Sequence, residues 1–63
     1  MNYIFVLLGD QFDWEDMIIF IDDDEARTAS IKNPHLRVEI FNKTKNGYKP
    51  SGCFYKNGNL IET

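Results

Sequence analysis

The chain has to fold with 63 residues and a single cysteine, Cys53, so no disulfide can join two of its parts. One cysteine and one histidine, His35, also fall short of a four-ligand zinc site of the usual Cys/His type. A domain of this length buries only about 60% of the surface that its unfolded chain exposes, and small domains commonly add a cross-link, a metal or a second subunit. We therefore expect one marginally stable domain over residues 1–63 that associates with copies of itself.

Short apolar, β-prone runs predict strands at 3–8, 17–21, 36–41 and 53–56, with an optional short edge strand at 59–61. The first run is apolar throughout, which indicates a central strand covered on both faces. The second is expected to pair with it in antiparallel fashion. Turns are predicted at Gly9–Asp16, Lys43–Gly47, Pro50–Gly52 and Asn57–Gly58.

One helix is predicted between Asp22 and Pro34. Asp22 with Glu25 three residues later is a capping pattern, and Pro34 stops the helix. Ala26 and Ser30 share a face with Ala29, and small residues let a helix sit close on a sheet. The predicted fold class is α+β: a single small β-β-α-β-β domain with one helix packed on an antiparallel sheet. Because one helix covers one face, the other face must meet solvent or another molecule.

The net charge of −3 is unevenly distributed. Residues 1–31 carry eight acidic residues and one basic residue, whereas residues 32–63 carry six basic and two acidic residues. We expect these halves to attract each other within the fold or between subunits. The basic half interleaves lysines with tyrosines, as a nucleic-acid-binding surface can, but nearby acidic residues oppose its field. Nucleic acid is therefore not expected as a partner.

Three groups of residues invite a catalytic or metal-binding interpretation, and each has a simpler one. The carboxylates of 22–25 lack the ligand spacing of a calcium loop and suit a helix N-terminus. Acids of the 10–16 loop could do acid–base chemistry only inside a cleft, for which the chain offers little room. Nothing in the sequence places Cys53 beside His35, and buried cysteines are common. We predict no enzyme activity, no catalytic or metal-binding residue and no cofactor.

Aromatic residues are numerous for so short a chain, and they favour interfaces as well as cores. Acidic neighbours make the rings of the 10–16 loop harder to bury. The residues predicted for an interface are Phe12, Trp14, Tyr48 and Tyr55.

The chain shows no secretion signal, and its first apolar run is too short to span a membrane. The lone thiol fits a reducing compartment. We expect an intracellular protein with no membrane partner, in which the sequon at Asn42 carries no sugar.

Several short runs together resemble one group of proteins. The pattern spans 14–61 and consists of Trp14–Phe20, Asp23–Ala26, Ala29–Ser30, Asn33–Pro34, Arg37–Phe41, Gly47–Pro50 and Tyr55–Gly58. It is similar to short uncharacterised proteins encoded by large DNA viruses that infect amoebae and algae. The resemblance implies a viral product, located in the virion or in the host cytoplasm or nucleus, with no family active site to transfer.

Three functions are compatible with these observations. The first is a homodimeric or higher homo-oligomeric protein-binding or structural protein, such as a virion component or a factor that acts on another viral or host protein. The second is an acidic mimic of nucleic acid, or a regulator, that uses residues 10–25 to bind a basic host protein. The third is a small enzyme, against which the missing motif spacing counts.

Overall fold

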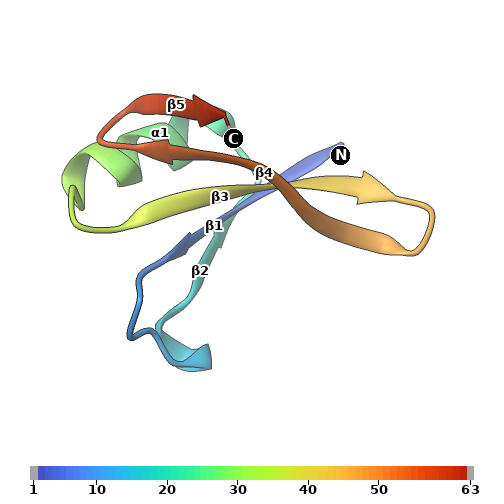
Figure 1. Ribbon diagram of the computed structural model, residues 1–63, viewed down its shortest axis with the longest axis horizontal. Coiled ribbons are helices and arrows are strands. Elements are labelled where there is room, and N and C mark those ends of the chain that lie inside the picture. Colours follow the sequence, from blue (N-terminus) through green and yellow to red (C-terminus); the bar gives the residue numbers. More distant parts are fainter. Residues whose placement is uncertain (1, 63) are drawn as a thin grey trace.

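The computed structural model describes residues 2–62. The elements are β1 (Tyr3–Leu8), a 3₁₀ helix η1 (Trp14–Asp16), β2 (Ile18–Phe20), α1 (Asp23–Lys32), β3 (Arg37–Thr44), β4 (Gly47–Lys56) and β5 (Asn59–Glu62). The strands form one antiparallel sheet in the order β2-β1-β3-β4-β5, and α1 lies across one of its faces (Figure 1). The predicted α+β class is confirmed, and the optional last strand is present.

The helix connects two strands that are not neighbours. Both β2 and β3 run antiparallel to β1, which lies between them, so they are parallel to each other. A connection between parallel strands must cross over the sheet, and α1 makes that crossing above β1. This placement makes β1 an interior strand, as its apolar sequence predicts.

Local sequence signals set both ends of α1. The Asp22 side chain accepts a hydrogen bond from the backbone N–H of Glu25 at 3.3 Å, which satisfies one free donor of the first turn. At the other end, both the backbone N–H and the side chain of Asn33 donate to the carbonyl of Ala29. Ala26 and Ser30 are fully buried against the sheet, which confirms the face predicted to pack.

The core lies between α1 and the sheet. It consists of the buried Phe5, Leu7, Ala26, Val38 and Tyr55, with the partly buried Phe20, Leu36 and Ile40 packed against them. Val38 has the largest fully buried side chain in the described part of the chain. A core this thin agrees with the marginal stability expected from chain length.

Strand β4 is longer than predicted, because Pro50-Ser51-Gly52 lies inside it and does not form a turn. Hydrogen-bonded and non-hydrogen-bonded residue pairs alternate along β3 and β4, starting from their turn. Pro50 falls in a non-hydrogen-bonded pair, so its nitrogen points away from β3, to a side on which no strand pairs with it. A bulge follows, in which Ser51 donates to the Ile40 carbonyl and accepts from the backbone N–H of Cys53. Gly52 supplies the positive φ of 90° that this irregularity requires.

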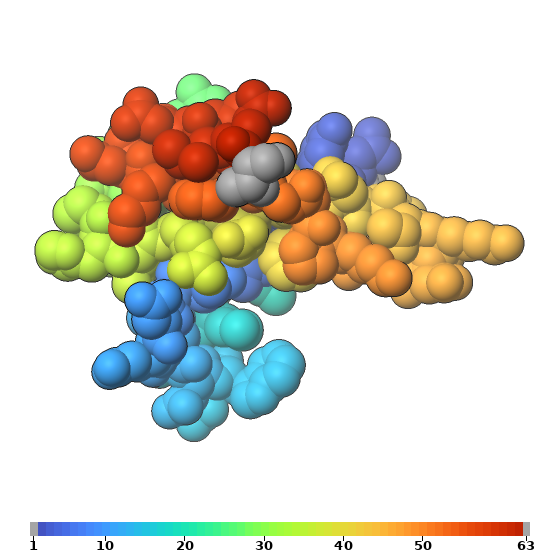
Figure 2. Space-filling view, in the orientation of Figure 1, coloured from blue at the N-terminus to red at the C-terminus, as the bar shows by residue number. Residues whose placement is uncertain are grey.

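Two segments project from the body of the domain. The distal part of the β3–β4 hairpin extends to one side, and the β1–β2 connection with η1 extends below the sheet (Figures 1 and 2). The hairpin carries Lys43, Lys45 and Lys49, and the β1–β2 connection carries the acidic residues of the 10–16 loop. Within residues 2–62, no helix has the length and apolar character needed to cross a membrane.

Candidate functional site

The face of the sheet opposite α1 has no helix over it and is largely apolar. Directly paired residues point to the same side of a sheet. The register therefore places Ile19, Val6, Glu39, Phe54 and Ile61 in one row, with Ile4 and Phe41 in the next. We call this surface, together with Arg37, the helix-free face.

The helix-free face is only partly protected within one chain. Val6 is buried, and Ile4, Phe41 and Phe54 are partly buried. At the two edges of the sheet, Ile19 is 61% exposed and Ile61 is 37% exposed. The prediction that β1 is covered on both faces therefore holds for one face, since only α1 packs over the sheet.

One ion pair interrupts this apolar surface. The Arg37 Nε donates to Glu39 Oε2 at 2.8 Å, and Glu39 retains only 20% of its side-chain exposure. Arg37 also lies 3.5 Å from the Asp10 carboxylate, which is 96% exposed. The Arg37–Asp10 pair is the ion pair that joins the acidic and basic halves among residues 2–62.

The two aromatic residues predicted on the β1–β2 connection have different surroundings. Trp14 is 85% exposed on η1, where Asp13 and Asp16 fold the backbone into a tight turn through a 3.1 Å hydrogen bond. Phe12 is partly buried and lies against Gly9, at which an added Cβ would come within 3.3 Å of the ring. Trp14 is thus available to a partner, whereas Phe12 anchors its own loop.

The two predicted tyrosines are also separated by the fold. Tyr48 is partly buried on the β3–β4 hairpin, and the Lys43 ammonium lies 5.2 Å from its ring centre. The register places Tyr48 on the same side as Phe41, so it extends the helix-free face. Tyr55 is only 5% exposed and belongs to the core, which removes it from the surface anchors. The pairing of Glu39 with Phe54 and of Val38 with Tyr55 turns Phe54 outward and Tyr55 inward, and the bulge before them keeps the alternation that starts at Tyr48.

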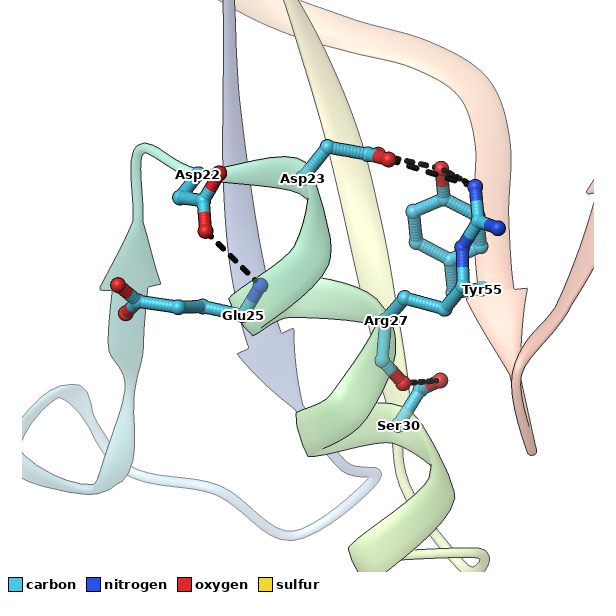
Figure 3. Close-up of polar contacts among 6 residues, drawn as sticks. All are labelled: Asp22, Asp23, Glu25, Arg27, Ser30 and Tyr55. Carbon is cyan, nitrogen blue, oxygen red and sulfur yellow. Dashed lines mark hydrogen bonds and ion pairs between the residues drawn. The ribbon is translucent and has the colours of Figure 1, made fainter.

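Tyr55 joins the sheet to α1 through a polar cluster (Figure 3). Its hydroxyl donates to Asp23 Oδ1 at 2.5 Å and accepts from Arg27 Nη2 at 3.2 Å, while Arg27 also pairs with Asp23 Oδ2 at 3.3 Å. The guanidinium carbon lies 5.1 Å from the ring centre. Burial, and then the bond to Asp23, raise the pKa of Tyr55, and the bond to Tyr55 raises the pKa of Arg27.

These contacts give structural roles to the first two acids of the 22–25 segment. Asp22 caps the helix and Asp23 holds Tyr55, while Asp24 and Glu25 remain exposed. Among residues 2–62, no three His, Cys, Asp or Glu side chains are grouped so that they could hold a metal ion.

Cys53 and His35 lie on different elements. Cys53 is partly buried in β4 opposite Glu62, and His35 is exposed in the loop between α1 and β3. No hydrogen bond joins the Cys53 thiol to His35 in the described structure.

The predicted site residues do not form one site, and the sequence predicted a face without a helix but not the residues that form it. Its signal is present as the second apolar set of β1, Ile4 and Val6, in register with Phe41 of β3. Comparisons with protein-family models, with curated proteins and with solved structures give no match.

Proposed function

We propose that this chain is a non-enzymatic protein-binding or structural protein that forms a homodimer through its helix-free face. The observation that carries the proposal is the apolar row from Ile19 to Ile61, which the single chain leaves partly exposed. A second copy supplies the cover that α1 gives the other face. The viral resemblance favours a role for such a dimer in a virion or in contact with a host protein.

The thin core supports association with a copy of the same chain. A stable interface buries about 800 Å² on each partner, which is roughly a sixth of the 4629 Å² that this chain exposes. Apolar area removed from water contributes about 25 cal/mol per Å², partly offset by the entropy of association. The Arg37–Glu39 pair puts both signs of charge on the face, so two copies can meet without like charges opposed.

Two neighbouring residues of β5 provide a matched test. Ile61 lies on the helix-free face, whereas Leu60, opposite Tyr55, lies on the helix side and is 52% exposed. We expect Ile61→Lys to weaken the dimer at least tenfold, because it buries a charge at the interface, and Leu60→Lys to leave association unchanged. Sedimentation equilibrium at micromolar concentrations measures both. A monomeric wild-type chain with a high melting temperature, or equal effects of the two substitutions, would contradict the proposal.

A specific observation favours a second function, in which the β1–β2 connection binds a basic protein as an acidic mimic. The connection projects from the domain (Figure 2), its acids are exposed, and it carries the exposed ring of Trp14. This function predicts salt-sensitive binding to basic proteins. Reversing the charges of Asp10, Asp13 and Asp16 together should abolish that binding, and binding that survives the triple change excludes the mimic.

A further inference from the structure

A groove lies between α1 and β2 on the helix side of the sheet. Its floor and walls are mainly apolar, and its lining residues are Leu7, Ile18, Phe20, Asp24, Glu25, Thr28, Ala29, Lys32 and Asn33. Helix α1 contacts β2 as well as β1, β3 and β4. It is separate from the helix-free face, which lies on the opposite side of the sheet.

The same edge of the sheet offers an unpaired backbone. The backbone N–H of Lys43 donates to the Asn2 carbonyl, so the backbone of Lys43 faces β1. Every second residue of β3 has the same orientation, so residues 41 and 39 also direct their backbone N–H and C=O groups toward β1. The backbone N–H and C=O of Val6 therefore bond to Glu39 and point away from β2. This alternation directs the N–H and C=O of Ile19 outward, to the side of β2 on which no described strand lies.

Strand β2 also lacks the usual protection of an edge. Met17, Ile18, Ile19 and Ile21 are all exposed apolar residues, and no proline, lysine or bulge interrupts the strand. Acidic residues stand at both of its ends, with Glu15 and Asp16 before it and Asp22 and Asp23 after it. Antiparallel pairing of β2 with a second copy of itself, centred on Ile19, would oppose Asp16 to Asp22, which disfavours this chain as the occupant.

We propose that the β2 edge and the α1–β2 groove form a binding site for an extended, basic segment of another protein, which adds to the sheet as a sixth strand. In this mode, main-chain hydrogen bonds give affinity and alternate side chains give specificity. The proposal concerns the edge and the helix side of β2, shares only Ile19 with the helix-free face, and does not depend on dimerisation.

The register fixes what each position of the segment must be. The residue opposite Ile19 exchanges both backbone hydrogen bonds with it, and its neighbours, opposite Ile18 and Phe20, point into the groove. The groove is apolar beside Ile18 and Ala29, and acidic near Phe20, where α1 begins with Asp24 and Glu25 exposed. An apolar side chain suits the first position, and lysine or arginine suits the second.

Selection from a random heptapeptide library tests the site with the full chain as bait. Thr28→Trp fills the groove from an exposed helix position, and Lys45→Trp, at the tip of the β3–β4 hairpin, adds the same ring elsewhere. We expect the wild type and Lys45→Trp to enrich alternating apolar peptides with a basic residue, and Thr28→Trp to lose them at least tenfold. Methylation of the peptide nitrogen facing Ile19 should reduce binding by a similar factor.

Two further measurements guard against a folding artefact and separate this proposal from the dimer. Asp24→Asn with Glu25→Gln should weaken the selected peptides about fivefold or more, whereas Asp10→Asn with Glu62→Gln should have less than a twofold effect. Amide hydrogen exchange of Ile19 should slow when a selected peptide binds, and this should persist in the Ile61→Lys monomer. Failure to enrich any peptide over Thr28→Trp, or enriched peptides that leave Ile19 exchange unchanged, would overturn the proposal.

Discussion

The two faces of the sheet are built from the same strands, but their apolar side chains are buried to different extents. On the helix side, Phe5, Leu7 and Val38 are buried under α1, and the polar groups that reach this layer are paired. On the helix-free face, Val6 is buried between neighbours, yet Ile19 and Ile61 at the edges remain open. The contrast shows that apolar patterning alone does not make a core, because a covering layer is also needed.

The covering layer is held by polar contacts as well as by apolar packing. Ser30 is fully buried, donates to the Arg27 carbonyl at 2.7 Å and accepts from the Gly58 N–H at 2.9 Å. It therefore links the last turn of α1 to the β4–β5 turn, while Tyr55 links the start of α1 to β4. On the helix-free face, the Arg37–Glu39 pair belongs to a single strand and fixes no second layer.

The largest expected difference between the faces is in the cost of removing an apolar side chain. Val38→Ala should destabilise the domain by roughly 2 to 3 kcal/mol, because it removes two buried methyl groups and leaves a cavity. Ile19→Ala should cost about 0.5 kcal/mol or less in the monomer. Urea unfolding below the dimerisation concentration measures both, and equal costs would mean that the two faces are packed alike.

A smaller effect is expected from the buried hydroxyl that ties the layers together. Ser30→Ala leaves the Gly58 N–H without its partner and should cost about 1 to 2 kcal/mol. Thr28→Ala, two residues away on the exposed groove side, should be neutral or slightly stabilising, because alanine favours helices. Thermal unfolding compares the two variants. Equal midpoints would show that the bond between Ser30 and Gly58 adds nothing to the helix-covered layer.

The sequence predicted the elements whose signals are local. The bounds of β1, the Asp22 cap of α1 and the Asn57-Gly58 turn, where both residues have positive φ, were all readable from neighbouring residues. The length of β4 was missed because Pro50 and Gly52 are turn residues in most settings. They fit here because one edge of the strand is free and a bulge follows, and both depend on distant pairing.

The candidate site was less predictable for the same reason. Phe54 and Tyr55 are adjacent aromatic residues, and nothing local says which one faces the helix. The register with β3 decides it, because Phe54 pairs with Glu39 and Tyr55 with Val38, so Tyr55 was grouped with surface rings although it lies in the core. In β3, by contrast, the alternation of apolar Val38 and Ile40 with Arg37 and Glu39 agrees with the core side in the structure, because no irregularity separates Val38 and Ile40 from their partners in β1.

The smallest effect, and the one that most sharpens the contrast between the faces, concerns the pH dependence of Tyr55. Its folded-state pKa is raised above the ordinary value of 10.0 by burial and by the bond to Asp23. The unfolded state therefore loses its proton first, so the stability is fully present below about pH 10 and declines as the pH rises through the folded pKa. Tyr55→Phe should remove this decline, at a cost of about 1 kcal/mol near neutrality.

Tyr48 gives the matched control, since it is a tyrosine of the helix-free side and lies outside the cluster of Tyr55, Asp23 and Arg27. Tyr48→Phe should leave the alkaline decline in place. Urea unfolding between pH 8 and 11 measures the slope for each variant. If Tyr48→Phe flattened the decline and Tyr55→Phe did not, the alkaline sensitivity would belong to the open face, and the polar cluster under α1 would have no part in it.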